Sequence, residues 1–168
     1  MQLNGRAIAD DVYAELAPQF ATLAQRARLG ILVVGVNPVI EQFVRIKSRA
    51  AELLKIEVAR ADLPEVATTE EVIRAVRELA TNTDALIVQL PMPKHIDVNA
   101  VLSEIPAAKD VDAINPIAEN DPEHVKAPVA LAVLELLARG GVEVAGKRAV
   151  VIGAGRLVGA PTAKLLKE

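Results

Sequence analysis

Cysteine and tryptophan are both absent from this 168-residue chain, and its aromatic residues are one tyrosine and two phenylalanines. The lack of cysteine excludes disulfides, thiolate nucleophiles, iron–sulfur clusters and thiolate zinc sites. With only two histidines, a histidine metal centre is not expected either, so the sequence predicts no metal site. Without large rings, the core must be packed from Ala, Val, Leu and Ile, which favours a layered α/β fold over an aromatic-rich β sandwich.

The chain also carries little net charge. The 19 basic and 22 acidic residues give a formal charge of -3, and no run of Lys and Arg is dense enough to bind a phosphate backbone. No apolar run approaches the roughly 18 residues of a membrane span, and the N-terminus has no targeting pattern. We therefore expect a cytoplasmic protein without nucleic-acid or membrane partners.

What the chain does have is apolar sequence, with 52% hydrophobic against 24% charged residues. Helical periodicity alternates with short β-rich runs, the pattern of a parallel sheet covered by helices. Strands are predicted at 31–36, 56–61, 85–90 and 148–152. Helices are predicted at 6–28, at 40–55, after a Thr68–Glu71 capping box, from Asp97 to Ile105, at 128–138 and in the last nine residues.

This order of elements predicts an α/β chain with a parallel-sheet N-terminal catalytic domain at 1–120. A linker and connecting helix follow at 121–141, and 142–168 reads as the first strand–helix unit of a Rossmann-like domain. Because a dinucleotide-binding half needs a βαβαβ set of strands, we interpret the sequence as a fragment of a longer protein.

Lys47 breaks an otherwise clean helical partition. On a wheel of about 100° per residue, apolar residues fill one half of the helix at 40–55, and Lys47 sits in the middle of that half. Burying an ammonium group is costly. Either the carbon chain of Lys47 lies along apolar surface with its amine in solvent, or the amine is buried because it has a function. The helix follows a buried strand, and in open α/β sheets the carboxyl ends of the strands form the ligand crevice. We therefore expect Lys47 to act as a general base or nucleophile.

Two further polar features follow predicted strands or turns. Gln89 ends an apolar strand, where its amide can meet a lysine from a neighbouring helix or be satisfied by the next loop. Asp110 and Asp112 can likewise be site residues or ordinary turn residues, since Asp is common in turns. As a metal-binding pair they would need further ligands, which the sequence does not offer.

A glycine stretch spaced GxGxxxG occupies residues 153–159, between a predicted strand and a predicted helix. That context is the one a dinucleotide fingerprint requires, although the spacing is one residue longer than the common form. Its backbone donors and the helix N-terminus can hold a pyrophosphate. The other interpretation is a tight strand–helix turn.

Several segments, in chain order, match the motifs of one known family. They are LNGR at 3–6, QFVRIK at 42–47 (the family's Y-V-x-x-K), VQLPMP at 88–93 (V-Q-L-P-L-P), KDVD at 109–112 (K-D-V-D-G) and AGKR at 145–148 followed by the glycine stretch. Together they resemble the bifunctional methylenetetrahydrofolate dehydrogenase/methenyltetrahydrofolate cyclohydrolase family, along all 168 residues.

The resemblance implies a multifunctional enzyme of one-carbon metabolism and purine biosynthesis, with a folate cleft between two α/β domains. It would oxidise 5,10-methylenetetrahydrofolate with NADP or NAD and hydrolyse the methenyl product to 10-formyltetrahydrofolate, as oxidoreductase and hydrolase. The resemblance and the exposed apolar end of the chain both favour a homodimer.

The resemblance also implies roles for individual residues. Lys47 would be the catalytic lysine, Gln89 would orient its amine, and Asp112 would hydrogen-bond the pterin ring. Phe43 would stack on the aminobenzoyl ring, with Leu90 and Pro91 beside it. The cofactor would be held by the loop residues Gly153, Ala154, Gly155, Arg156 and Gly159.

The chain departs from the family pattern at several of these places. Phe43 stands for a Tyr, Ile40 for a Ser and Ala113 for a Gly, while APVALA at 127–132 replaces P-C-T-P-x-G and removes a Thr. Ala154 and Gly155 stand where many relatives have Arg-Ser, so the sequence does not choose between NADP and NAD.

Two other functions therefore stay open. One is a degenerate folate-binding protein without turnover, which the departures favour. The other is a different two-domain dehydrogenase, such as the shikimate type, which predicts no folate binding and leaves the Gln89-Leu90-Pro91 run unexplained.

Overall fold

The structure is a computed structural model, and it describes residues 3–167. At its centre is a parallel sheet in the order β2-β1-β3. The strands are β1 (Arg28–Val34), β2 (Glu57–Leu63) and β3 (Ala85–Val88). In the register of this sheet, Leu32 of β1 lies beside Ala61 of β2 and Val88 of β3. The predicted strands at 31–36, 56–61 and 85–90 are thus confirmed as a parallel set, with ends shifted by a few residues.

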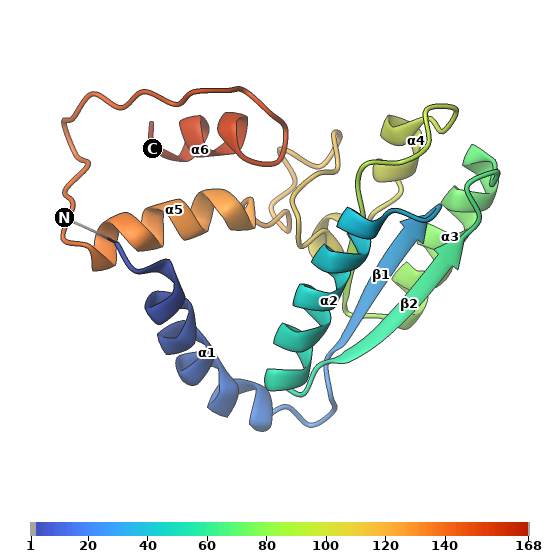
Figure 1. Ribbon diagram of the computed structural model, residues 1–168, viewed down its shortest axis with the longest axis horizontal. Helices are drawn as coiled ribbons and strands as arrows, with labels where there is room; N and C mark the ends of the chain where they lie inside the picture. The colour runs from blue at the N-terminus through green and yellow to red at the C-terminus, as the bar shows by residue number, and fades with distance from the viewer. Residues whose placement is uncertain (1–2, 168) are drawn as a thin grey trace.

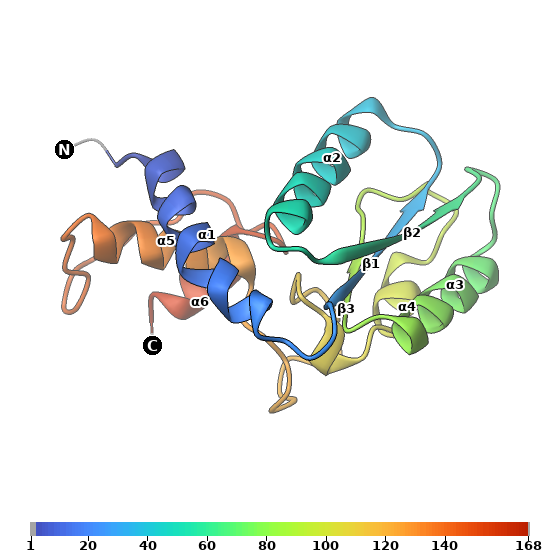
Figure 2. The ribbon, with the colours of Figure 1, turned by 90° about the horizontal axis from the view of Figure 1, so that it is seen from below.

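Helices cover both faces of the sheet. Helix α2 (Pro38–Leu53) lies on one face, and α3 (Thr69–Asn82) and α4 (Val98–Leu102) lie on the other (Figure 1; Figure 2). Successive side chains of a strand point to opposite faces, so Ile31 and Val33 pack with α2 while Leu32 and Val34 pack with α3 and α4. A strand buried on both faces explains why β1 reads as a continuous apolar run.

Side-chain caps fix where the helices around the sheet begin. Asn37 accepts hydrogen bonds from the first N–H groups of α2, and Asp97 accepts from Ala100 in α4. Thr68 and Glu71 form the predicted capping box of α3, with both reciprocal bonds present. A 3₁₀ turn, η1 (Ala107–Lys109), follows α4 and leads into the loop that carries Asp110 and Asp112.

The remaining helices form a second group at the other end of the molecule. Helices α1 (Gly5–Ala21), α5 (Pro128–Arg139) and α6 (Gly159–Leu165) lie side by side there, away from the sheet (Figure 1; Figure 2). Arg139 of α5 reaches Glu15 of α1 at 3.1 Å. The helix predicted over 6–28 is shorter than expected, because it ends at Ala21 and β1 already begins at Arg28.

The strand predicted at 148–152 is wrong. This segment forms no strand in the structure, and Val150 and Ile152 are 87% and 97% exposed. Within residues 3–167 no strand lies beside it to pair with its backbone groups, and no apolar layer covers its side chains. The β-rich sequence is therefore present without the neighbours that a strand needs.

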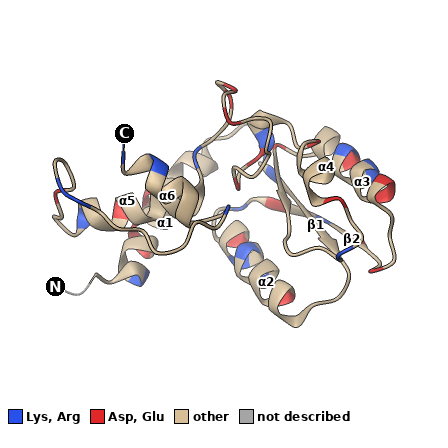
Figure 3. Ribbon diagram, turned by 90° about the horizontal axis from the view of Figure 1, so that it is seen from above, with Lys and Arg blue, Asp and Glu red and all other residues tan. Residues whose placement is uncertain are grey.

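Residues of both charge signs are interspersed along α2 and α3 (Figure 3). Arg77 of α3 contacts Glu104 after α4 at 2.8 Å, and this hydrogen bond holds the pKa of the Glu104 carboxyl below its ordinary value. Arg60 of β2 likewise bonds Glu41 of α2 and lowers the pKa of that carboxyl. None of the helices between residues 3 and 167 is long and apolar enough to cross a membrane.

Candidate active site

Helix α2 carries two columns of apolar residues, and Lys47 lies in the column that faces the sheet. The sheet-facing column is buried and consists of Ile40, Val44, Ala51 and Leu54, with Lys47 between Val44 and Ala51. The second column is exposed and consists of Val39, Phe43, Ile46 and Leu53. Lys47 thus lies between buried apolar residues along the helix, whereas the second column of the predicted apolar half is exposed.

The Lys47 amine lies between an amide and a carboxylate. Its Nζ donates a hydrogen bond to Gln89 Oε1 at 3.2 Å and lies 3.5 Å from Asp112 Oδ2. The side chains of Lys47 and Asp112 are 29% and 23% exposed, so the ion pair is only partly open to solvent. The structure thus brings together the three predicted catalytic residues, and the amine does not extend freely into water. We refer to Lys47, Gln89 and Asp112 as the lysine cluster.

Gln89 reaches the lysine cluster because of where β3 ends. Ile87 packs on the α2 face, and residue 89 points the same way because strand side chains alternate. The backbone N–H of Gln89 bonds Leu32 O at 2.9 Å, which anchors it to β1. Its Nε2 donates to Leu90 O at 3.2 Å, and this bond leaves Oε1 aimed at the lysine.

The two aspartates that looked equivalent in the sequence have separate places. Asp112 is the one that pairs with Lys47. Asp110 is fully buried, and its Oδ2 accepts backbone N–H groups of Ile114 and Asn115 at 2.8 and 2.7 Å. Its role is to shape the loop that carries Asp112.

The predicted folate-contact residues lie on different sides of the sheet. Phe43 is one turn before Lys47 on α2 and is 52% exposed, so its ring is open to a ligand. Leu90 instead packs against the cluster formed with α3 and α4, on the face opposite Lys47. Pro91 is exposed and follows a cis peptide bond.

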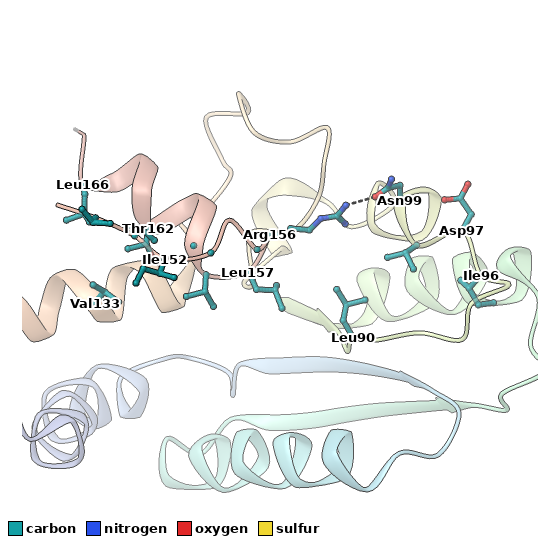
Figure 4. Close-up of a pocket in the computed structure, with 17 residues that line it drawn as sticks. Leu90, Ile96, Asp97, Asn99, Val133, Ile152, Arg156, Leu157, Thr162 and Leu166 are labelled. Atoms are coloured by element: carbon teal, nitrogen blue, oxygen red, sulfur yellow. Dashed lines mark hydrogen bonds between the residues drawn. The ribbon is translucent and has the colours of Figure 1, made fainter. Parts of the chain in front are cut away.

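The glycine stretch lies apart from the lysine cluster. Together with Leu90 it lines an open hollow of about 1080 Å³, and Arg156 donates to Asn99 of α4 at 2.8 Å across one side of it (Figure 4). Lys47 and Asp112 do not line this hollow. This hollow and the lysine cluster are therefore different places.

The chemistry available in the lysine cluster is that of a positioned amine. The Asp112 carboxylate lies beside the amine, Gln89 fixes the direction of one N–H, and the amine can exchange a proton with a ligand placed over Phe43. Within residues 3–167 no three His, Cys, Asp or Glu side chains come together as metal ligands. The side chains of the cluster are equipped for acid–base chemistry.

Comparison with known proteins places this geometry in a family. The family model described as the tetrahydrofolate dehydrogenase/cyclohydrolase catalytic domain matches residues 3–112, a range that includes the whole lysine cluster. The bifunctional protein FolD of Solibacter usitatus is 36% identical over 98% of this chain and 56% of its own length. The corresponding protein of Lacticaseibacillus casei is also 36% identical, over 98% of this chain and 62% of its own.

Solved structures of the same kind share the fold. The bifunctional FolD enzyme of Campylobacter jejuni superposes with a TM-score of 0.91 at 29% identity, over 98% of this chain and 62% of its own. The Trypanosoma brucei FolD enzyme, solved with NADP and an inhibitor, has a TM-score of 0.91 at 35% identity, over 99% and 61%. The chain spans 56% to 62% of the length of the curated relatives named above.

Proposed function

The chain belongs to the tetrahydrofolate dehydrogenase/cyclohydrolase family, and from that premise we propose that it binds a tetrahydrofolate at the lysine cluster and hydrolyses its methenyl bridge. The whole activity proposed is oxidation of 5,10-methylenetetrahydrofolate to the methenyl form and hydrolysis to 10-formyltetrahydrofolate. The observation that carries the hydrolytic half is the Lys47 amine, fixed 3.2 Å from Gln89 Oε1 and 3.5 Å from Asp112 Oδ2.

In this proposal Lys47 handles the protons of the hydrolysis. Water adds to the cationic bridging carbon and loses one proton, which leaves a hydroxyl on that carbon. The bond from the carbon to N5 then breaks and N5 takes up a proton, while the hydroxyl loses its own proton and becomes the oxygen of the formyl group on N10, so one proton is released overall. Lys47 exchanges those protons as amine and ammonium. Gln89 orients the amine, Asp112 hydrogen-bonds the pterin, and Phe43 offers its face to the aminobenzoyl ring. Leu90, whose side chain packs on the opposite face of the sheet, and Pro91 would border the substrate where the chain continues after Gln89.

The oxidation would use NADP or NAD as hydride acceptor, and the loop expected to hold it contains Gly153, Ala154, Gly155, Arg156 and Gly159. The loop as arranged in the structure does not fit a pyrophosphate. The N–H groups of Val158 and Ala160, at the start of α6, already donate to Gly155 O at 3.3 and 3.1 Å. A Cβ at Gly159 would lie 2.0 Å from Gly153 O, so the loop is folded back onto the helix. We therefore derive no hydride step through these residues.

Three further assignments belong to the same proposal. The catalytic domain comprises 1–120, the linker and connecting helix 121–141, and the start of the cofactor domain 142–168. The location proposed is the cytoplasm, and the assembly proposed is a homodimer, which the exposed Val150 and Ile152 support because they offer apolar surface.

The proposal is tested by measuring turnover and binding on the same preparation. Purified protein is incubated with 5,10-methenyltetrahydrofolate, and the loss of substrate is followed spectrophotometrically after subtraction of the uncatalysed rate. Affinity for tetrahydrofolate is measured by calorimetry, and NADP and NAD are titrated separately. Turnover that saturates with substrate supports the proposal. The absence of both binding and turnover contradicts it.

A second candidate is folate binding without turnover, and two positions favour it. Ala113, which stands for the family's Gly, has φ of +53°, a conformation that costs a non-glycine residue about 1–2 kcal/mol next to Asp112. Ile40, which stands for a Ser, is buried in the core at 3% exposure and offers no hydroxyl to the site. Tight binding with no turnover would identify this case.

The shikimate-type alternative is wrong, because the match at 3–112 is to the tetrahydrofolate family.

A further inference from the structure

Asp110 is a buried carboxylate whose surroundings shape the neighbouring catalytic loop. Its side chain is fully buried, and a carboxylate without water must be compensated by hydrogen bonds or by charge. Oδ2 accepts N–H groups of Ile114 and Asn115 at 2.8 and 2.7 Å, while Oδ1 has no hydrogen-bond partner among the described residues. The hydrogen bonds that compensate for burial of the Asp110 carboxylate are therefore made to Oδ2.

These bonds close a short loop around Asp112. The backbone of Asp110 bridges to Leu86 of β3, so one end of the loop is fixed to the sheet. The Asp110 carboxylate ties the other end through Ile114 and Asn115, and the Ala113 N–H donates to Asp110 O at 3.1 Å. Asp112 lies within this closed loop, and its position against Lys47 depends on the loop staying closed.

His124 supplies the remaining side-chain contact to that carboxylate. Its Nε2 lies 3.3 Å from Asp110 Oδ2, and its side chain is only 12% exposed. Because a carboxylate only accepts hydrogen bonds, Nε2 must carry the proton, whether the ring is neutral or charged. His124 comes from the linker that leads to α5, 14 residues after Asp110, and its backbone N–H donates to Asp121 O at 3.0 Å.

We infer that His124 is a positioning residue: it holds the Asp110 carboxylate in place and thereby keeps Asp112 against the Lys47 amine. This inference deepens the proposed function, since it names what maintains the lysine cluster, and it rests on that function for its importance. The geometry also joins the linker to the site, because His124 contacts the carboxylate that holds the loop carrying Asp112.

The test measures the state of the Lys47 amine and needs neither folate nor turnover. Folded protein is acylated with a trace of an amine-reactive ester, and the modification rate of Lys47 is measured by mass spectrometry relative to the exposed Lys94. Asp112→Asn removes the carboxylate charge directly and sets the reference. Because a partly exposed ion pair is worth at most about 1 kcal/mol, we expect Asp112→Asn to raise the relative rate about two- to fivefold.

Variants at His124 then separate positioning from general stability. His124→Ala should raise the Lys47 rate toward that of Asp112→Asn. His124→Gln, whose amide N–H can occupy the place of Nε2, should restore the wild-type rate. His124→Asn places its amide nearer the backbone and should resemble the alanine variant, which provides a second loss variant if His124→Ala does not fold. Circular dichroism melts establish that each variant is folded at the labelling temperature.

A double variant decides whether His124 acts through Asp112. In the Asp112→Asn background, His124→Ala should leave the Lys47 rate unchanged, because nothing remains for it to position. An equal increase in both backgrounds would overturn the inference, as would a wild-type rate in folded His124→Ala or no change in Asp112→Asn. Turnover is measured separately, so an inactive wild-type protein contradicts the proposed function and leaves this result standing.

Discussion

Replacing Lys47 with methionine separates the chemistry of the site from the stability of the fold. Methionine keeps an unbranched side chain in the sheet-facing column between Val44 and Ala51 and removes the amine. The interactions lost are those with Gln89 and Asp112, which are partly exposed and together worth about 1 kcal/mol or less. The apolar neighbours compensate in part, because the methionine side chain packs against them.

The expected effects on stability and on rate therefore differ greatly in size. A change of about 1 kcal/mol shifts Tm by about 2–4 °C in a protein of this length. Loss of a positioned proton-transfer group lowers turnover by about 10²–10⁴-fold, which is about 2.7–5.4 kcal/mol in the activation barrier. A folded variant with almost no hydrolysis is the expected result.

The assay follows hydrolysis of 5,10-methenyltetrahydrofolate by absorbance, with thermal melts on the same samples. Arg49→Met is the matched control, since it removes a cation from the exposed side of the same helix, two residues away. It should retain wild-type turnover. If Lys47→Met keeps turnover within about tenfold of the wild type, a general acid–base role for the amine is refuted, because such a role contributes at least about 10²-fold.

Three predictions concern the stability of the fold. Lys55 follows the C-cap of α2 with a φ of +58°, so replacing it by glycine should stabilise the fold by about 0.5–1 kcal/mol in urea unfolding, with Lys55→Ala as the unchanged control. Thr68→Ala should lower the free energy of unfolding by about 1 kcal/mol, because it removes half of the capping box with Glu71. The pKa of Glu104 is lowered in the folded state by Arg77, so this pair stabilises the fold above the unfolded pKa and the contribution is lost as pH falls through the lower, folded value. Arg77→Met should accordingly make unfolding less sensitive to acid below pH 4.5, the ordinary value for glutamate, and an unchanged pH profile would contradict the assignment.

Elements that depend on local sequence were predictable. The apolar run of β1, the capping box of α3 and the Asp97 cap of α4 all appear where the pattern placed them. Elements that depend on distant partners were not. The run at 148–152 has the composition of a strand, but a strand exists only when a neighbour pairs with its backbone, and that information lies outside the segment.

The same distinction holds within the site. The anomalous place of Lys47 on a helical wheel and of Gln89 at a strand end gave a local signal, and the structure joins the two at 3.2 Å. Asp110 and Asp112 could not be told apart, because burial of one and pairing of the other depend on a loop closed by backbone N–H groups. His124 gave no signal, since a lone histidine in an acidic linker has no pattern that ties it to a loop 14 residues earlier.

The lysine cluster is assembled from three pieces that all belong to the sheet half: the sheet-facing column of α2, the carboxyl end of β3 and the loop after η1. The glycine stretch lies on the opposite side of the sheet and lines a hollow that the lysine cluster does not share. Hydrolysis of the methenyl bridge is redox-neutral and needs only proton transfer, whereas oxidation needs a cofactor placed by the glycine loop. The two proposed half-reactions thus depend on different parts of the chain. The pairing of Lys47 with Gln89 and Asp112 can support the hydrolysis, while the arrangement of residues 153–159 does not support the oxidation.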